Sequence, residues 1–297
     1  MNDQNSALLM VKPDGVHQGL TAAVLAFLRA RGFEAHCIRR MHLTPAARSA
    51  LYATTRSTGQ LDWDLNGVLY TLGPVDAVLL TARDFPPDHG SAAAHVSRDL
   101  KGHFVPTRSA PGTLRGELNA MNPIFNLVHT SDDPEECSRE ARVLFGEDWR
   151  SLLGPRSATA ASGTAVAAPH ARLLDHWATL ATTLGPLLAA APRQGLALLY
   201  EFGWPASQTP DAAPQDRHRQ YQAAHNTLTG LATALRSGHV SEIHPLLPEL
   251  LPGGVRFPTL AEFLRQAQTR QPGLSAWDAY LTYTTLRYLD LCLEELL

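Results

Sequence analysis

Three residues near the middle of the sequence have the types and the order needed for covalent chemistry at one histidine. His129 ends an apolar run, Ser131 follows it closely, and Glu140 lies in the segment after that. A neutral imidazole can attack electrophilic phosphorus with one ring nitrogen when an acceptor orients the other. Glu140 has the chemistry of that acceptor, and Ser131 could steady it. The pattern therefore allows a reactive His129, although a histidine in this place is more often a packing residue.

Basic residues that could neutralise phosphate charge occur in the same half of the chain. Lys12 sits where an apolar run meets the turn "KPDG", and Arg98 and Arg115 lie in "SRDLKG" and "PGTLRG". Guanidinium groups suit phosphate because their planar donors match its oxygens in pairs. A single basic residue is usually a solvated surface charge, so these residues indicate phosphate chemistry only as a set.

Several common nucleotide and metal motifs are absent from the sequence. It contains no phosphate loop of the Gly-x-x-x-x-Gly-Lys kind, no dinucleotide fingerprint and no His-Glu-x-x-His pattern. Its three cysteines are widely spaced, which argues against a disulfide framework and against a paired-cysteine zinc site. We therefore expect no metal held by the protein alone.

Composition places the chain among soluble globular proteins. The sequence has 297 residues, 44% of them hydrophobic and 18% charged, and a net charge of -3 from 25 basic and 28 acidic residues. This balance gives no electrostatic reason to expect nucleic acid or a membrane surface as a partner. The apolar run near the start is too short for a signal peptide or a membrane span. We expect a cytoplasmic protein.

Strand and helix patterns alternate through the first half of the chain. Apolar patterns predict strands at 7–11, 33–43, 75–82 and 124–130, separated or followed by helices at 21–32, from 44 onward, at 92–100 and at 134–146. In the first helix, Ala23, Phe27 and Ala30 share one face. Alternation of this kind predicts an α/β fold, with helices packed on a small sheet, over residues 1–150.

The second half of the chain differs in composition. Residues 151–170 are rich in Ala, Ser, Gly and Pro, which is typical of a flexible linker. Helical patterns follow at 171–192, 216–238, 259–271 and 275–297 and predict an all-helical domain over residues 171–297, whose role the sequence leaves open. Its tyrosines Tyr280, Tyr283 and Tyr288 could line a pocket, but packing between helices is their more ordinary role.

Residues 6–150 resemble the nucleoside diphosphate kinases. The resemblance rests on four blocks in the family's order, "LLMVKPDGV", "GPVDAVLL", "APGTLRG" and "NLVHTSDDPEECSRE". It implies a ferredoxin-like α+β sandwich and a ping-pong reaction. In that reaction the γ-phosphate of ATP or another nucleoside triphosphate passes to a histidine and then to a diphosphate acceptor. It also implies Mg²⁺ carried by the nucleotide phosphates, and we expect a homo-oligomer.

The resemblance also gives roles to particular residues, with His129 as the phosphorylated histidine and Ser131 and Glu140 as the pair that supports it. The remaining matches are Lys12, Arg98 and Arg115 as phosphate-binding cations, Tyr52 as the active-site tyrosine, and Asn126 as the contact to the nucleotide sugar. An oriented imidazole surrounded by cations supplies the positioning and charge neutralisation that phosphoryl transfer requires.

The chain departs from the family near the nucleotide. Phe104 replaces a phosphate-contacting threonine, Phe125 an arginine and Thr130 a glycine, while Trp63 is the one aromatic residue in a segment that is usually Phe-rich. These changes predict altered base recognition with the phosphate chemistry kept. Two other hypotheses are a nucleotide-binding regulatory module that signals through the helical domain, and a scaffold. The retained histidine, cations and carboxylate favour a phosphotransferase.

Overall fold

A computed structural model of the chain describes residues 3–54, 60–83, 90–118, 120–154, 259–270 and 276–294. The chain divides into two compact units, Met1–Val166 and Ala167–Leu297. Most of the described residues, including every candidate site residue, belong to the first unit.

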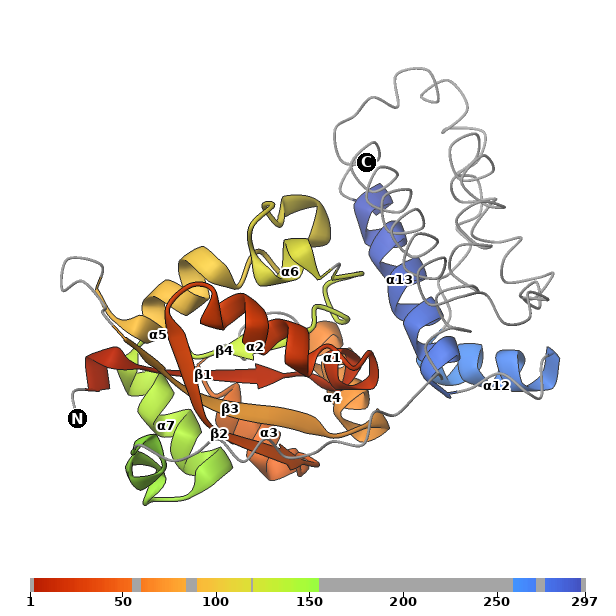
Figure 1. Cartoon of the computed structure of the whole chain (residues 1–297). Coiled ribbons are helices and arrows are strands. Elements are labelled where there is room, and N and C mark those ends of the chain that lie inside the picture. The colour runs from red at the N-terminus through yellow and green to blue at the C-terminus, as the bar shows by residue number, and fades with distance from the viewer. Residues whose placement is uncertain are drawn as a thin grey trace. The chain divides into compact units, whose positions relative to one another are not determined.

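The first unit combines a small sheet with helices, as Figure 1 shows. Its strands are β1 Ser6–Val11, β2 Phe33–Met41, β3 Val75–Ala82 and β4 Val128–Thr130. Its α-helices are α1 Pro13–His17, α2 Thr21–Arg29, α3 Pro45–Leu51, α4 Gln60–Leu72, α5 Ala92–His95, α6 Leu114–Glu117 and α7 Pro134–Phe145. Short helical turns of other types are η1 Asp3–Asn5, η3 Val96–Leu100, η4 Pro106–Arg108 and η5 Trp149–Leu153.

The four strands form one antiparallel sheet in the order β2-β3-β1-β4. All six residues of β1 are buried, and this strand lies between β3 and β4; after Ser6 its sequence is apolar, as expected for a central strand. Met10 of β1 pairs with His129 of β4. The α+β fold predicted for this half is confirmed at the level of a four-stranded antiparallel sheet with packed helices, and the sheet sets His129 beside the end of β1.

The fourth strand is much shorter than the predicted 124–130. Asn122 Oδ1 accepts hydrogen bonds from the backbone N–H groups of Ile124 and Phe125, which turns the chain there. Leu127 then adopts φ 71°, in the left-handed region, where the chain cannot continue an extended strand. The prediction was wrong for these residues because the side-chain turn competes with strand pairing.

The helix predicted at 21–32 ends earlier and buries a different face. In α2 the buried residues are Val24 and Leu28, whereas Ala23 is exposed. Larger apolar side chains one helical turn apart remove more apolar surface from water than alanines do, so they set the buried face. Helix α4 was not predicted, since its Asp, Asn, Gly and Thr residues interrupt the helical pattern.

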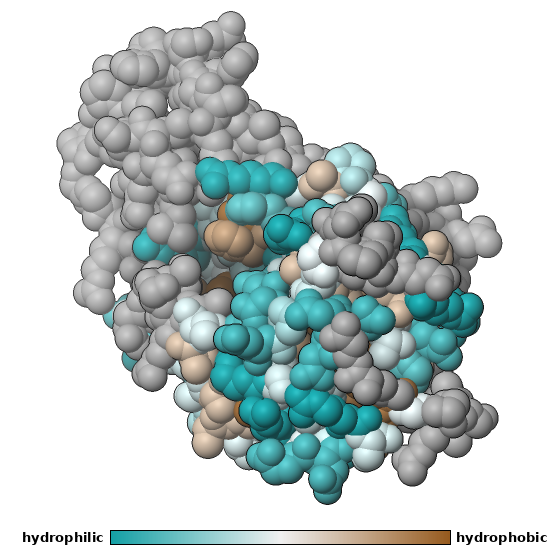
Figure 2. All heavy atoms as spheres, turned by 90° about the vertical axis from the view of Figure 1, so that its left-hand side faces the viewer, coloured by the Kyte–Doolittle hydropathy of each residue, from teal (hydrophilic) through white to brown (hydrophobic). Residues whose placement is uncertain are grey.

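Helix α7 and its neighbours cover the core formed by β1 and β3. Helices α3 and α7 pack beside each other, and α7 also contacts β1 (Figure 1). Trp149 and Leu153 of η5 complete this core. The first residues of the predicted linker, 151–153, thus belong to η5, and the linker from 155 onward lies outside the described residues. Among the residues that are coloured in Figure 2, most on the face drawn are hydrophilic.

Two helices of the second unit are described, α12 Leu260–Arg270 and α13 Ala276–Glu294. They agree closely with the helices predicted at 259–271 and 275–297. Phe263 of α12 packs on Tyr283 of α13, with ring centroids 5.5 Å apart. All three tyrosines of α13 are buried. The helices predicted at 171–192 and 216–238 lie outside the described residues. Of the helices that the structure describes, none has both the length and the apolar composition needed to span a membrane.

Candidate functional site

His129 is held from one side by a buried carboxylate. Its Nε2 lies 2.9 Å from Oε2 of Glu140, and Ser131 Oγ donates to the same oxygen at 2.7 Å. An ionised carboxylate only accepts hydrogen bonds, so Nε2 carries the proton and Nδ1 keeps its lone pair. The imidazole is therefore held in the tautomer that leaves Nδ1 unprotonated, which is the form that a nucleophilic histidine would need.

The position of Glu140 depends on where helix α7 begins, and that start is well defined. Asp133 is its N-cap and accepts a hydrogen bond from the backbone N–H of Glu136 at 2.8 Å, and Pro134 occupies the first turn. Acidic residues in that turn, Glu135 and Glu136, also suit the positive end of the helix dipole. Because the helix begins at a defined residue, the position of Glu140 relative to β4 is fixed.

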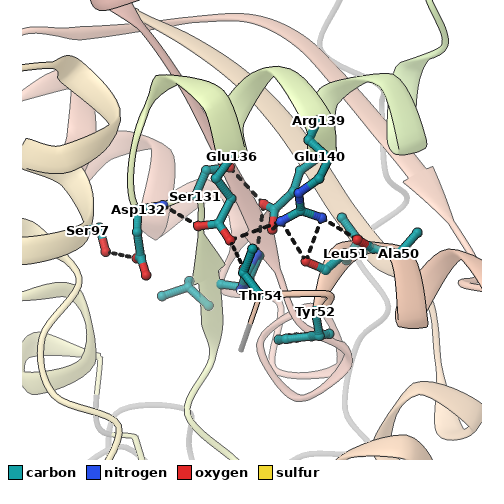
Figure 3. Close-up of polar contacts among 12 residues, drawn as sticks. Ala50, Leu51, Tyr52, Thr54, Ser97, Ser131, Asp132, Glu136, Arg139 and Glu140 are labelled. Atoms are coloured by element: carbon teal, nitrogen blue, oxygen red, sulfur yellow. Dashed lines mark hydrogen bonds and ion pairs between the residues drawn. The ribbon is translucent and has the colours of Figure 1, made fainter. Parts of the chain in front are cut away.

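The ring of Tyr52 covers another side of the imidazole. Its centroid lies 4.9 Å from that of His129, with the ring planes at 58°. The Tyr52 hydroxyl lies 2.5 Å from the hydroxyl of Tyr70. Burial raises the pKa of Tyr52 to about 12, so the phenol stays neutral at physiological pH. Figure 3 shows Tyr52, Ser131 and Glu140 in this cluster.

Lys12 lies at the end of β1 and precedes α1. Its ammonium is buried and donates to the carbonyl of Ile124 at 2.6 Å and to Oδ1 of Asn126 at 2.7 Å. A lysine has three donors, so one proton remains for a phosphate oxygen. Burial lowers the pKa of Lys12 to about 8, partly offset by Asp14. A bound phosphate would favour the charged form.

This pKa predicts a pH dependence of stability that Lys12 alone should cause. An unfolded chain keeps lysine protonated up to about pH 10.4. Between that value and about 8, the unfolded chain binds more protons than the folded chain, so the contribution of Lys12 to stability increases as pH rises. Denaturant unfolding of wild type and Lys12→Met over this range measures it. The wild type should gain stability relative to the variant as pH rises, and a constant difference would contradict the assigned pKa.

The turn after β1 holds the segment before β4 in its unusual conformation. Asp14 Oδ2 accepts from the backbone N–H of Leu127 at 2.8 Å, and the carbonyl of Leu127 accepts from the N–H of Lys12 at 2.8 Å. A Cβ on Gly15 would lie 2.9 Å from that carbonyl oxygen, so only glycine fits. The turn "KPDG" therefore supplies the ammonium and also the contacts that stabilise the left-handed Leu127.

Arg115 is buried and faces backbone carbonyls. Its guanidinium donates to the carbonyls of Gly102 at 3.0 Å, Asn126 at 3.0 Å and Val128 at 2.8 Å. Burial lowers its pKa to about 10. An arginine has five N–H donors, so these three bonds leave donors for a phosphate while they tie α6 to the segment that leads into β4.

The structure brings most of the predicted residues into two neighbouring groups. Glu140, Ser131 and Tyr52 surround His129, while Lys12 and Arg115 both bind the segment 124–128 that leads into it. Arg98 is the exception, since it lies exposed on η3 and makes none of the hydrogen bonds found among the described residues.

The structure shows the surroundings of three residues at which the sequence differs from the nucleoside diphosphate kinase pattern, namely Phe104, Phe125 and Trp63. Phe104 is 50% exposed and stacks on His103 at 4.6 Å between ring centroids. Phe125 is buried. The guanidinium of Arg48 lies 3.7 Å from the centre of the Trp63 ring, and Tyr52 meets that ring edge-on at 6.0 Å. One face of the Trp63 ring is thus occupied by an arginine.

Thr130 next to His129 carries a buried hydroxyl, Oγ1, that has no hydrogen-bond partner among the described residues. A buried hydroxyl without a partner lowers stability, and valine has nearly the same shape. We therefore expect Thr130→Val to raise the free energy of unfolding by up to about 1 kcal/mol. Denaturant titration measures this, with Thr130→Ser as the control that keeps the hydroxyl. A loss of stability in the valine variant would show that the hydroxyl is satisfied.

The structure also reveals contacts that the sequence did not predict. Arg139 contacts Glu140 and Glu136, as Figure 3 shows, and Lys101 donates to Ser97 and Asp132. Spacing of opposite charges along α7 could have pointed to Arg139, which lies one turn after Glu136. Within the described ranges no three His, Cys, Asp or Glu side chains gather in a way that could hold a metal ion.

Comparisons with known proteins bear on the same half of the chain. The family model described as "Nucleoside diphosphate kinase" matches residues 5–161. A nucleoside diphosphate kinase from Moorella thermoacetica is 33% identical over 136 residues, covering 46% of this chain and 90% of that protein. One from Staphylothermus marinus is 30% identical over 148 residues, covering 50% and 96%. A solved nucleoside diphosphate kinase from Encephalitozoon cuniculi aligns at 20% identity and a TM-score of 0.43, covering 52% of this chain and 94% of that one.

Proposed function

Because the chain belongs to the nucleoside diphosphate kinase family, we propose that it transfers the γ-phosphate of a nucleoside triphosphate through phosphorylated His129 to a diphosphate or a specialised acceptor. One observation carries this proposal. The Nε2–H of His129 is bound by the buried Glu140, which leaves Nδ1 as the nucleophile. A packing histidine would not need a buried carboxylate that is steadied in turn by Ser131.

The first step forms a bond between Nδ1 of His129 and the γ-phosphorus and breaks the bond from that phosphorus to the bridging oxygen. The nucleoside diphosphate leaves with the electron pair, and the Nε2 proton stays on the ring, where Glu140 stabilises the positive charge that develops. In the second step a terminal oxygen of the acceptor attacks the same phosphorus and the imidazole leaves. One site thus serves donor and acceptor in turn.

Charge neutralisation falls to the cations around the phosphates. Lys12 offers its remaining proton, and Arg115 offers donors beyond those that bind carbonyls. Arg98, which is exposed on η3, would supply a further guanidinium to the phosphates. Mg²⁺ would arrive with the nucleotide, because it keeps several waters and is bound mainly by substrate phosphates in kinases.

The part of the site that would meet the base differs from the family, which supports a specialised acceptor or donor. Arg48 stacked on Trp63 offers a cation and an aromatic surface together. Exposed Phe104 replaces a polar phosphate contact with an apolar ring. We infer altered base or acceptor specificity from these two positions. Assembly into a homo-oligomer stays a prediction, which light scattering of the full-length chain would test.

Steady-state kinetics of the full-length chain test the proposed function. ATP and a panel of nucleoside diphosphates are varied together, and double-reciprocal plots should give parallel lines because one product leaves before the second substrate binds. Intersecting lines would contradict the phosphohistidine route. Calorimetry on the same nucleotides separates the alternatives, since binding without transfer would indicate a regulatory module and absence of binding a scaffold.

A further inference from the structure

Arg139 links the end of helix α3 to helix α7, the two segments that carry Tyr52 and Glu140 on either side of His129. Its guanidinium donates to the carbonyl of Ala50 and, at 3.2 Å, to that of Leu51, at the end of α3. On its own helix it lies 3.0 Å from Oε1 of Glu136 and 3.3 Å from Oε1 of Glu140. Figure 3 shows Arg139 between these carbonyls and carboxylates. None of the roles given above to the site residues uses this arginine.

The first connection runs through Glu140, whose side chain is completely buried. A buried carboxylate stays ionised only when it is paired. Among the described residues its ion-pair partners are His129 and Arg139. Since His129 must be neutral to attack phosphorus, Arg139 is the cation that remains beside Glu140 at that moment. The two carboxylate oxygens of Glu140 have different partners. Oε2 binds His129 and Ser131, and Oε1 binds Arg139.

The second connection runs through the end of α3. Carbonyls in the last turn of a helix have no partner within the helix, and a cation is favourable there. Leu51 is directly followed by Tyr52, whose ring lies against His129. Thr54 adds a parallel contact, because its hydroxyl donates to Oε1 of Glu136 at 2.5 Å. Arg139 therefore fixes the segment that carries Tyr52 to the helix that carries Glu140.

We propose that Arg139 is a positioning residue for the transfer reaction, holding the imidazole of His129 between Glu140 and Tyr52 and keeping Glu140 ionised while His129 is neutral. The inference rests on the proposed phosphotransferase function, which supplies the reaction that Arg139 would affect.

Loss of the arginine charge has a consequence that loss of packing does not share. The groups around His129 are Glu140, Tyr52 and the nearby Asp132. Around Glu140 they are Arg139, His129 and Ser131, with Tyr52 and Cys137 close enough to feel its charge. Without Arg139 the carboxylate would hold the protonated imidazole more strongly. Phosphorylation of His129 should then require a higher pH.

Three variants separate charge, geometry and general disruption. Arg139→Met removes both the charge and the fork of donors. Arg139→Lys keeps the charge but cannot bind two carbonyls and two carboxylates at once. Arg142→Met is the matched control, because Arg142 is on the same helix and pairs with the exposed Glu147. The rate of labelling by γ-labelled ATP is measured against pH for each full-length chain, with denaturant unfolding to check the fold.

We expect Arg139→Met to be labelled roughly 10- to 100-fold more slowly than wild type near neutral pH, since small displacements of a reacting group have effects of this size. The acid limb of its pH profile should move to higher pH. Arg139→Lys should be slower but keep the wild-type acid limb, and Arg142→Met should match wild type in both. The inference would be overturned, with the proposed function left intact, if Arg139→Met had the labelling rate and pH profile of wild type. It would also be overturned if the acid limb of Arg139→Lys moved to higher pH as far as that of Arg139→Met. A wild type that takes no label would contradict the proposed function, and the inference with it.

Discussion

Replacing His129 with glutamine should reduce phosphoryl transfer by at least roughly 10⁴-fold, because the variant lacks the nitrogen that we propose as the nucleophile. Glutamine keeps a polar group of similar length that can still donate to Glu140, so the pair around Oε2 should survive. The loss should appear in kcat, whereas nucleotide affinity, which depends on the cations, should change little. Coupled steady-state assays and calorimetry on the same preparation measure the two quantities.

His36→Gln is the matched control for this prediction. His36 lies on β2 and bonds the Thr81 hydroxyl at 2.7 Å, a contact that glutamine can also make, and it takes no part in the site. Its activity should equal that of wild type. If His129→Gln kept activity within tenfold of wild type, phosphate would have to pass directly between the nucleotides, and the ping-pong mechanism would be wrong.

Replacing Lys12 with methionine should reduce kcat/KM by about 10²- to 10³-fold, the usual effect of removing one preorganised group that stabilises transition-state charge. Methionine fills a similar volume but leaves the Ile124 carbonyl and the Asn126 amide oxygen without their donor. Each unpaired buried acceptor costs about 1–3 kcal/mol, offset in part because a buried charge is also removed. The kinetic loss should therefore exceed anything that the change in stability explains.

Arg83→Met provides the comparison for loss of one positive charge. Arg83 pairs with Glu34 in an exposed salt bridge, and such pairs contribute little. Its kcat/KM should stay near that of wild type. A Lys12→Met variant that folds and loses less than tenfold would show that Lys12 serves the segment 124–126 and not the phosphates.

Several features of the fold and site could be predicted from the sequence because they are local. The apolar run of β1 reflects a strand buried on both faces, and Val75–Ala82 forms β3 as its pattern indicates. Helix α7 follows from its capping residue and proline. With these elements in place, the contact between His129 and Glu140 follows from a strand and a helix that are adjacent in the chain.

Other features depend on contacts between distant residues and leave no local pattern. The left-handed conformation of Leu127 is stabilised by Asp14, which lies in a turn more than a hundred residues earlier. Because that contact is not visible in the local sequence, the apolar residues around Leu127 were predicted to form a strand. Arg115 could be identified as a cation, but its carbonyl partners could not. Arg139 bonds Leu51 across 88 positions, which is why its position between Glu140 and Tyr52 appears only in the folded chain.

The most direct test of the account is a single turnover without an acceptor. Full-length protein mixed with γ-labelled ATP should take up a stoichiometric amount of label that is acid-labile, alkali-stable and located on His129. Adding a nucleoside diphosphate should then discharge it into a nucleoside triphosphate. The account would be contradicted by transfer between nucleotides without any labelled protein, or by equal labelling of His129→Gln.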